Sequence, residues 1–271
     1  MKDTYAFHNT LVKAREFFLK KGLVEVPVQS RLSILAACED PKTVSTFNYD
    51  GIVWPLPQTG QMWLEHELLK NPNENGFFCL STSYRNEPNP IPGRHEKIFP
   101  MLEFEIKGNQ EDLIQFEHDF VEYLLGDKSF EVGYEEAADK YSVSILEDSH
   151  EEELCSEYGN SVILKDFPRR TSPFWNMRRH AGDTDLYKKV DVLIDGIETI
   201  GSAERAVDVD EMREDFYTIS DGEYAELLFE KFGKDRVESE LNQYFNNDFM
   251  ERFGGGIGMT RLAQAFMRRQ K

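Results

Sequence analysis

Side chains that bind phosphate groups and metal ions gather in three stretches that lie far apart in the chain. The first is a loop region that carries Arg85, Glu87, Arg94, His95 and Phe99. Arginine suits a phosphate group because its planar guanidinium stays charged and donates two parallel hydrogen bonds to the oxygens. This loop is therefore a candidate site for a phosphorylated ligand.

The second and third stretches supply carboxylates and glycines. Asp191 and Glu198 stand seven residues apart across Gly196, and a Mg²⁺ carried by a nucleotide takes only one or two protein carboxylates. The third stretch is GGGIGMTRL at 254–262. Its glycines let the backbone approach a ligand closely, and Arg261 follows on the predicted helix. Each pattern alone is more often structural, so the interpretation depends on the three together.

Hydrophobic periodicity and turn residues predict the elements that position these side chains. The predicted helices span 9–22, 61–69 and 111–125, with one or two more in 134–161, several in 208–253, and a last one that GGGIG at 254–258 opens and that ends near 267. The predicted strands span 23–28, 77–84, 99–107, 161–165 and 189–194, with another ending near 200 and a hairpin or loop at 45–57. One α+β domain over residues 1–271, built around an antiparallel sheet, accounts for this order.

The composition is that of a globular protein, with 40% hydrophobic and 30% charged residues among 271. No apolar run approaches the roughly 18 residues of a membrane span, and the N-terminal residues lack the features of a signal peptide. The three cysteines, Cys38, Cys79 and Cys155, form no CxxC pair, so neither a zinc site nor a disulfide framework is expected. We therefore expect a soluble, cytoplasmic protein with no membrane partner.

The charge balance bears on nucleic-acid binding. The chain has 31 basic and 50 acidic residues, which gives a formal net charge of -19. Binding of nucleic acid depends on clustered lysine and arginine side chains that neutralise phosphates. Adjacent arginines occur at 169–170, 178–179 and 268–269. A tRNA partner is therefore doubtful, although a local basic patch could bind one.

Taken in order, these segments resemble the catalytic core of class II aminoacyl-tRNA synthetases, in the aspartate, asparagine and lysine subgroup. The segments that carry the resemblance are PQTGQMWLE at 57–65, SYRNE at 83–87, GRHEKIFPMLEFE at 93–105, FPRRTSPFWNM at 167–177, ETIGSAER at 198–205 and GGGIGMTRL at 254–262. They include matches to the second and third signature motifs of the family and run in the family order.

The resemblance implies both a fold and a reaction. The implied fold is α+β, with a six- or seven-stranded antiparallel sheet flanked by helices. The implied reaction is that of a ligase, in which an amino-acid carboxylate attacks the α-phosphate of ATP and gives an aminoacyl adenylate and pyrophosphate. ATP and Mg²⁺ are the implied cosubstrate and cofactor, and a homodimer is the implied assembly.

The resemblance also implies a set of ATP-binding residues. These residues are Arg85, Glu87, Arg94, His95, Phe99, Asp191, Glu198 and Arg261. Arg85 would hold the α-phosphate and the attacking carboxylate, while Arg261 would cover adenine and reach the γ-phosphate, so these two would be the catalytic residues. Asp191 and Glu198 would hold Mg²⁺, and Phe99 would stack under adenine.

The amino-acid end of the site distinguishes the subgroup members. Gln61 and Glu103 match positions that bind the substrate ammonium, and Arg205 matches the guanidinium that meets the substrate side chain. Aspartate-specific relatives carry Lys where this chain has Leu64, whereas Glu65 fits the asparagine-type pattern GQxxxE. A missing cation and an added carboxylate favour a neutral amide over a second carboxylate. Asparagine, or a similar small polar amino acid, is therefore the first expectation and aspartate the second.

Three features depart from the family pattern. The first predicted helix begins near residue 9, which leaves no room before it for the anticodon-binding barrel of this subgroup. In the first signature motif, a dimer element, Pro27 follows Gly22 at five residues rather than seven. In the third motif, Thr260 stands where relatives have an acidic residue before Arg261.

These observations favour a stand-alone synthetase paralogue that activates an amino acid as its adenylate and passes it to an acceptor other than a full tRNA. Three alternatives remain open. They are a truncated asparaginyl-tRNA synthetase that charges tRNA, an asparagine-synthetase-like enzyme that uses ammonia, and a non-catalytic module that binds ATP or an amino acid and signals to a partner.

Overall fold

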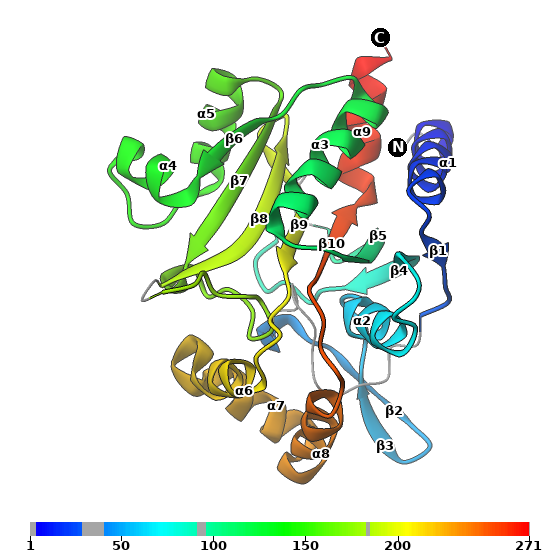
Figure 1. Cartoon of the computed structure of the whole chain (residues 1–271), viewed down its shortest axis with the longest axis vertical. Coiled ribbons are helices and arrows are strands. Elements are labelled where there is room, and N and C mark those ends of the chain that lie inside the picture. Colours follow the sequence, from blue (N-terminus) through cyan, green and yellow to red (C-terminus); the bar gives the residue numbers. More distant parts are fainter. Residues whose placement is uncertain (1–3, 29–40, 91–95, 183–184, 271) are drawn as a thin grey trace.

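The computed structural model describes residues 4–28, 41–90, 96–182 and 185–270. Their main feature is an eight-stranded sheet in the order β1-β4-β5-β10-β9-β8-β7-β6 (Figure 1). In that order the strands are β1 (Val24–Glu25), β4 (Gly76–Tyr84), β5 (Ile98–Lys107), β10 (Arg252–Gly258), β9 (Ile197–Glu204), β8 (Leu186–Ile194), β7 (Ser161–Pro168) and β6 (Phe130–Gly133). The arrangement of a sheet flanked by helices agrees with the predicted α+β class, and the sheet is larger than expected.

Three helices cover one face of the sheet (Figure 1). They are α1 (Thr4–Lys20), α3 (Gln110–Leu125) and α9 (Met259–Arg269). Phe18 of α1 is fully buried and meets Phe78 of β4 edge to face, at 5.1 Å between ring centroids. A buried phenylalanine contributes about 1.5–3 kcal/mol through the removal of its apolar surface from water. The main core therefore lies between these helices and the sheet.

The remaining helices lie at the margins of the sheet. At the β6–β7 end they are α4 (Tyr134–Tyr141) and α5 (Asp148–Tyr158); against β4 and β5 lies α2 (Gln61–Lys70); and at the lower end of the view in Figure 1 lie α6 (Val209–Thr218), α7 (Glu223–Phe232) and α8 (Lys234–Phe245). Short 3₁₀ turns occur at Pro41–Thr43, Arg169–Thr171 and Ile219–Gly222. In the part of the chain that the structure describes, no helix is long and apolar enough to cross a lipid bilayer.

The predicted hairpin is present and follows from its turn residues. Strands β2 (Thr46–Tyr49) and β3 (Ile52–Pro55) pair antiparallel in a separate two-stranded sheet. Asp50 and Gly51 join them with φ values of 53° and 76°. Two left-handed residues in succession are what a two-residue hairpin turn requires, and Asp-Gly is a preferred pair for it.

The expectation of an antiparallel sheet of six or seven strands was wrong in two respects. The sheet has eight strands, and it is mixed, because β1 pairs parallel with β4 and β6 pairs parallel with β7. β1 and β6 contain only two and four residues. Strands this short show no clear alternation in the sequence, so their pairing is set by tertiary packing.

The glycine-rich segment also differs from its prediction. Residues 254–258 were expected to open the last helix, but they belong to β10, which pairs antiparallel with β5 on one side and β9 on the other. The helix begins only at Met259. Glycine has low strand propensity, so the sequence pattern concealed a central strand.

Candidate active site

The two faces of β5 and β10 separate the core from a possible binding site. Leu102, Phe104 and Ile106 of β5 belong to the core beneath the helices. Side chains alternate between the faces of a strand, so Met101, Glu103 and Glu105 lie on the opposite face. The glycines Gly254, Gly256 and Gly258 of β10 pair with these three residues in the order Glu105, Glu103, Met101. On this face β10 therefore presents only backbone, and the surface formed by Gly254, Gly256 and Gly258 is called the floor of the site.

Neighbouring side chains pack closely over these glycines. A Cβ atom on Gly256 would lie 2.5 Å from Met101 Cε, and one on Gly254 would lie 1.7 Å from Glu105 Oε2. Contacts under 3 Å are not found for real Cβ atoms. The glycine run thus lets acidic side chains of β5 lie across β10.

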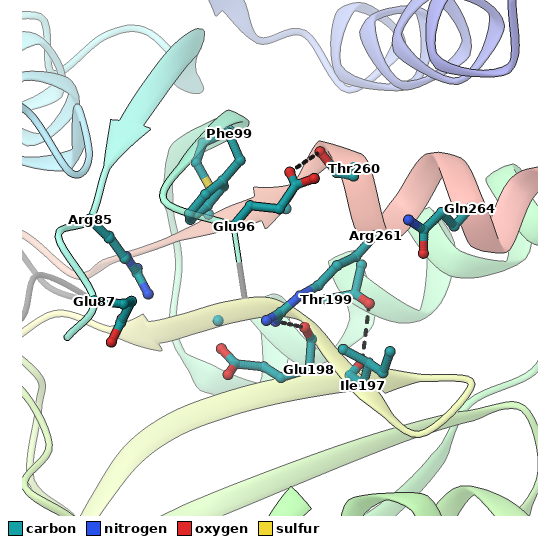
Figure 2. Close-up of a pocket in the computed structure, with 14 residues that line it drawn as sticks. Arg85, Glu87, Glu96, Phe99, Ile197, Glu198, Thr199, Thr260, Arg261 and Gln264 are labelled. Atoms are coloured by element: carbon teal, nitrogen blue, oxygen red, sulfur yellow. Dashed lines mark hydrogen bonds between the residues drawn. The ribbon is translucent and has the colours of Figure 1, made fainter. Parts of the chain in front are cut away.

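A pocket of about 210 Å³ opens above this floor (Figure 2). Its lining includes Arg85 and Glu87 after β4, Phe99 of β5, Glu198 of β9 and Arg261 of α9. Each of the three stretches that were singled out in the sequence therefore contributes side chains to one cavity, although Asp191 is not among the lining residues. Arg94 and His95, which were also predicted here, lie outside the described residues.

Arg85 is placed by the base of the loop that follows β4. Its backbone N–H donates to the Lys97 carbonyl at 2.8 Å. Its guanidinium lies 5.6 Å from the centre of the Phe99 ring, within the range of a cation–π contact. A cation and an aromatic face thus point into the same pocket.

Arg261 approaches from the first turn of α9. One of its guanidinium nitrogens donates to the backbone carbonyl of Glu198 (Figure 2). The preceding Thr260 donates from Oγ1 to Glu96 Oε2 at 3.1 Å. Thr260, which replaces the acidic residue of the family motif, is thus linked to a carboxylate from the loop before β5. Neither Glu96 nor Gln264, which also lines the pocket, was predicted. Glu96 lies within the segment 93–105 that carries the family resemblance, whereas no quoted segment includes Gln264.

Asp191 and Glu198 come from the neighbouring strands β8 and β9. Asp191 is buried, its Oδ2 accepts from Lys189 Nζ at 2.5 Å, and its Oδ1 has no hydrogen-bond partner. Burial raises the pKa of Asp191 to about 7, the nearby Glu198 adds to this, and Lys189 opposes it. A divalent cation would reduce the repulsion between Asp191 and Glu198 and would provide a partner for Asp191 Oδ1.

The pair fits a cation whose other ligands come from elsewhere. Among the residues that the structure describes, no group of three or more His, Cys, Asp or Glu side chains could hold a metal ion. A nucleotide-borne Mg²⁺ needs only one or two protein carboxylates, so the donor set fits that kind of ion.

The predicted ammonium site lies beside the floor on the α2 side. Glu103 is fully buried and accepts hydrogen bonds from the hydroxyls of Thr59 and Ser81 and from the Gly60 N–H, the last at 3.0 Å to Oε2. Burial raises the pKa of Glu103, while these donors oppose the rise. Gln61 is also buried, and its Oε1 accepts from Arg205 Nη2 at 3.0 Å.

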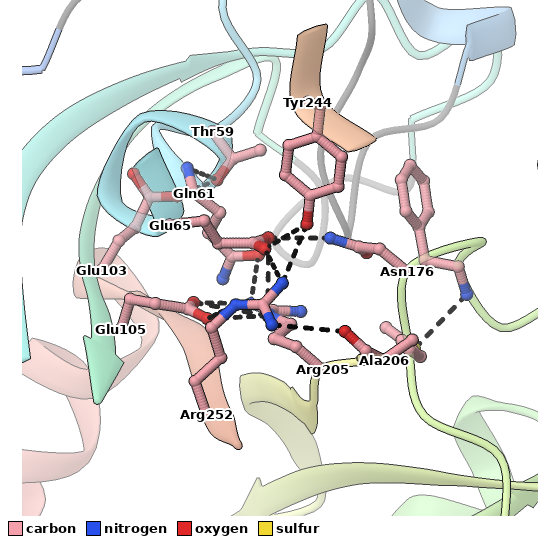
Figure 3. Close-up of polar contacts among 12 residues, drawn as sticks. Thr59, Gln61, Glu65, Glu103, Glu105, Asn176, Arg205, Ala206, Tyr244 and Arg252 are labelled. Atoms are coloured by element: carbon pink, nitrogen blue, oxygen red, sulfur yellow. Dashed lines mark hydrogen bonds and ion pairs between the residues drawn. The ribbon is translucent and has the colours of Figure 1, made fainter. Parts of the chain in front are cut away.

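Arg205 belongs to a buried ionic network (Figure 3). It contacts Glu105 at 3.2 Å and Glu65 at 3.7 Å. Arg252 contacts the same carboxylates, Glu65 at 2.6 Å and Glu105 at 3.7 Å. All four side chains are fully buried. When both glutamates are ionised, their charges balance those of the two arginines, which removes the large cost of an unpaired buried ion.

Several members of this network were not foreseen. Gln61, Glu65, Glu103 and Arg205 were predicted, and they lie on the same side of the sheet. Sequence reasoning missed Glu105, Asn176, Tyr244 and Arg252. Glu105 and Asn176 lie within segments that carry the family resemblance, and Arg252 lies just before the third motif, so these residues carried a signal. Tyr244 comes from the acidic segment that matches no motif.

Comparisons with known proteins agree with this geometry. Residues 3–271 match the family described as tRNA synthetases class II (D, K and N). Comparison with curated proteins gives no match.

Solved structures share the fold over 97% of this chain. Asparaginyl-tRNA synthetase from Pyrococcus horikoshii, complexed with asparaginyl-adenylate, superposes with a TM-score of 0.81 at 19% identity. Asparaginyl-tRNA synthetase and aspartyl-tRNA synthetase from Entamoeba histolytica give TM-scores of 0.78 and 0.73 at 18% and 16% identity. The chain spans 64% of each asparaginyl enzyme and 55% of the aspartyl enzyme.

Proposed function

Because the chain belongs to the class II tRNA synthetase family of the D, K and N type, we propose that it is an ATP-dependent ligase that activates an amino acid as its adenylate. The observation that carries this proposal is the meeting of Arg85, Glu198 and Arg261 at one pocket. Two guanidinium groups and a carboxylate from separate elements suit a triphosphate with its metal ion.

The reaction would consist of one displacement at phosphorus. An oxygen of the amino-acid carboxylate attacks the α-phosphorus, the bond to the bridging oxygen breaks, and pyrophosphate leaves. Negative charge collects on phosphate oxygens, so the protein contributes through positioning and electrostatic stabilisation. Arg85 is proposed to hold the α-phosphate and the attacking carboxylate, and Arg261 to hold the γ-phosphate.

The other pocket residues complete the proposed ATP site. Phe99 offers a ring for adenine to stack on, and Glu87 offers a carboxylate for its amino group. Asp191 and Glu198 are proposed to hold Mg²⁺, which when bound neutralises charge on the phosphate oxygens. Arg94 and His95 remain proposed contacts of the β- and γ-phosphates on the sequence resemblance alone.

Asparagine is the proposed amino acid, with aspartate second. Glu103 and Gln61 would receive the substrate ammonium, because an ammonium has three donors and needs acceptors. Arg205 and Glu65 lie next to this site in the balanced network. No net positive charge is left there for a second carboxylate, whereas an amide can both donate and accept.

The acceptor is proposed to be a group other than a full tRNA, and the protein is proposed to act as a homodimer. Product identity separates this proposal from its alternatives. Aminoacyl-tRNA would indicate a truncated asparaginyl-tRNA synthetase, and asparagine made from aspartate and ammonia would indicate the synthetase-like alternative.

The test is amino-acid-dependent exchange of labelled pyrophosphate into ATP, measured with each of the twenty amino acids. We expect exchange with asparagine above all others. A clear preference for a large apolar amino acid would overturn the assignment of the amino-acid site. Stabilisation by ATP without exchange would favour a non-catalytic binding module, because a ligand that binds only the native state stabilises it regardless of turnover.

A further inference from the structure

The helical segment α6–α8 reaches the amino-acid end of the site through one side chain. Tyr244, near the end of α8, donates its hydroxyl to Glu65 Oε2 at 2.6 Å and accepts from Arg252 Nη2 at 2.9 Å. Its ring stands at 86° to Trp175, with centroids 5.5 Å apart. Trp175 is fully buried, so packing against its indole ring fixes the position of the Tyr244 ring.

Glu65 is held on all sides by these partners (Figure 3). Its Oε1 accepts from Asn176 Nδ2 at 2.7 Å and lies 3.7 Å from Arg205 Nε. Its Oε2 accepts from both Tyr244 and Arg252 at 2.6 Å. The carboxylate could not turn toward a substrate without leaving buried donors unsatisfied, which is costly. Glu65 therefore acts on a substrate through its neighbours.

The network borders the pocket on one side. Arg205 Nη2 donates to Gln61 Oε1 at 3.0 Å, and Gln61 Nε2 lies 3.9 Å from the point where a Cβ of Gly256 would stand. Gly256 lines the pocket. A displacement of Glu65 would thus move Arg205 and Gln61 and change the surface beside Gly256, where a substrate side chain would lie.

We propose that Tyr244 and Arg252 are positioning residues for amino-acid selection, an inference that rests on the proposed adenylate-forming function. They hold Glu65 in a charge-balanced network that fixes the guanidinium of Arg205 for a neutral side chain. Helix α8 thereby influences selectivity at a site whose walls come from α2, β5 and β10. Part of the acidic segment 208–253 supports this site from behind Glu65.

The first test compares two tyrosine variants of the same helical segment. Tyr244→Phe keeps the ring that packs on Trp175 and removes only the hydroxyl. Tyr217→Phe is the matched control, because Tyr217 of α6 is partly exposed and its hydroxyl binds Glu238. Both proteins are compared with the parent by pyrophosphate exchange, with kcat and KM determined separately for asparagine and for ATP.

We expect Tyr244→Phe to raise the KM for asparagine about fivefold to tenfold, the scale of one ordinary hydrogen bond, with the KM for ATP unchanged. Tyr217→Phe should change neither. Equal changes in both KM values for Tyr244→Phe would indicate general destabilisation and overturn the inference. So would a Tyr244→Phe protein that behaves like the control.

A second test measures how well the site distinguishes a charged from a neutral substrate side chain. Glu65→Gln removes one negative charge from the network and keeps the shape of the side chain. The ratio of kcat/KM for aspartate to that for asparagine should rise at least tenfold, because the network then carries an extra positive charge. An unchanged ratio in a folded variant would contradict charge-balanced selection.

Binding without turnover separates failure of this inference from failure of the proposed function. The probe is asparaginyl-sulfamoyl adenosine, in which a sulfamoyl group replaces the phosphate of the adenylate. The measured quantity is the change in Tm that the probe causes. Tyr244→Phe should reduce the shift given by this probe and leave that given by ATP. If the parent neither exchanges pyrophosphate nor binds the probe, the proposed function itself is wrong and the inference falls with it. If the parent does both and Tyr244→Phe does not differ from it, only the inference is wrong.

Discussion

At the scale of single residues, the arginines of the site divide into those that line the pocket and those that contact buried carboxylates. Arg85 and Arg261 line the pocket, while Arg205 and Arg252 are fully buried among carboxylates. The first pair lines the cavity proposed for the phosphate groups, and the second pair shapes the polarity of the neighbouring site. The two pairs of arginines are thus proposed to have different tasks.

Replacement of Arg85 tests the phosphate assignment. Arg85→Ala should lower the rate of pyrophosphate exchange by roughly 10² to 10³, the scale for removal of one preorganised donor. Arg15→Ala is the control, because Arg15 lies on α1 in a surface ion pair with Glu25, and surface pairs contribute little to stability. A normal exchange rate in Arg85→Ala would remove Arg85 from the reaction.

The ionisation of Glu105 predicts a pH-dependent selectivity. Burial raises the pKa of Glu105 to about 7, Arg205 and Arg252 oppose the rise, and Glu65 adds to it. As pH falls through 7, Glu105 gains a proton and the network gains one positive charge. The ratio of kcat/KM for aspartate to that for asparagine should therefore rise as the pH is lowered from about 8 to about 6. Exchange rates with both amino acids check this, and a flat ratio would argue against it.

At the scale of the elements, β10 has the most demanding sequence. Its glycines lie where β5 places acidic side chains across the floor, and a Cβ on Gly254 would also lie 2.7 Å from Arg205 Nη2. The strand therefore couples backbone packing to the position of the ionic network. Its low strand propensity is offset by ladders with two neighbouring strands.

Gly254→Ala tests this coupling. The added methyl should destabilise the fold by about 1–3 kcal/mol through overpacking and should weaken stabilisation by the sulfamoyl probe. Gly133→Ala is the matched control, because Gly133 has φ of -75° and a Cβ there would come no closer than 3.9 Å to a neighbour. Denaturant melts measure both variants. Equal melting midpoints for Gly254→Ala and the parent would contradict the packing argument.

Elements with strong local patterns could be predicted from the sequence, and those set by tertiary contacts could not. The strands predicted at 77–84 and 99–107 are present and pair antiparallel, since the first is a long run of apolar and small residues and the second alternates with a period of two. The short β6 escaped notice because its parallel pairing with β7 is non-local. Motif order predicted that Arg85 and Arg261 would meet, but nothing local showed that Tyr244 would reach Glu65.

At the scale of the whole molecule, the charge balance sets the expectation for large partners. The net charge is -19, and the paired arginines 169–170, 178–179 and 268–269 mostly contact acidic side chains. These ion pairs leave little positive field for a polyanion. We therefore expect the molecule to bind small substrates rather than an extended nucleic acid.

Binding of tRNA measures this directly. At an ionic strength of about 0.15 M, where the Debye length is about 8 Å, we expect no binding of tRNA in a filter or gel-shift assay. Tight binding with a steep dependence on salt would indicate many contacts between basic side chains and the phosphates of tRNA. That result would favour the tRNA-charging alternative.

The central claim is that three distant stretches of the chain act on one triphosphate. The most direct measurement is pyrophosphate exchange with asparagine by the parent and by Arg85→Ala, Glu198→Gln and Arg261→Ala, each verified as folded. We predict exchange by the parent and a loss of at least roughly tenfold in every variant, because each change removes a charge that stabilises the same transition state. Exchange that persists at the parental rate in any of the three, or that is absent from the parent, would contradict the account.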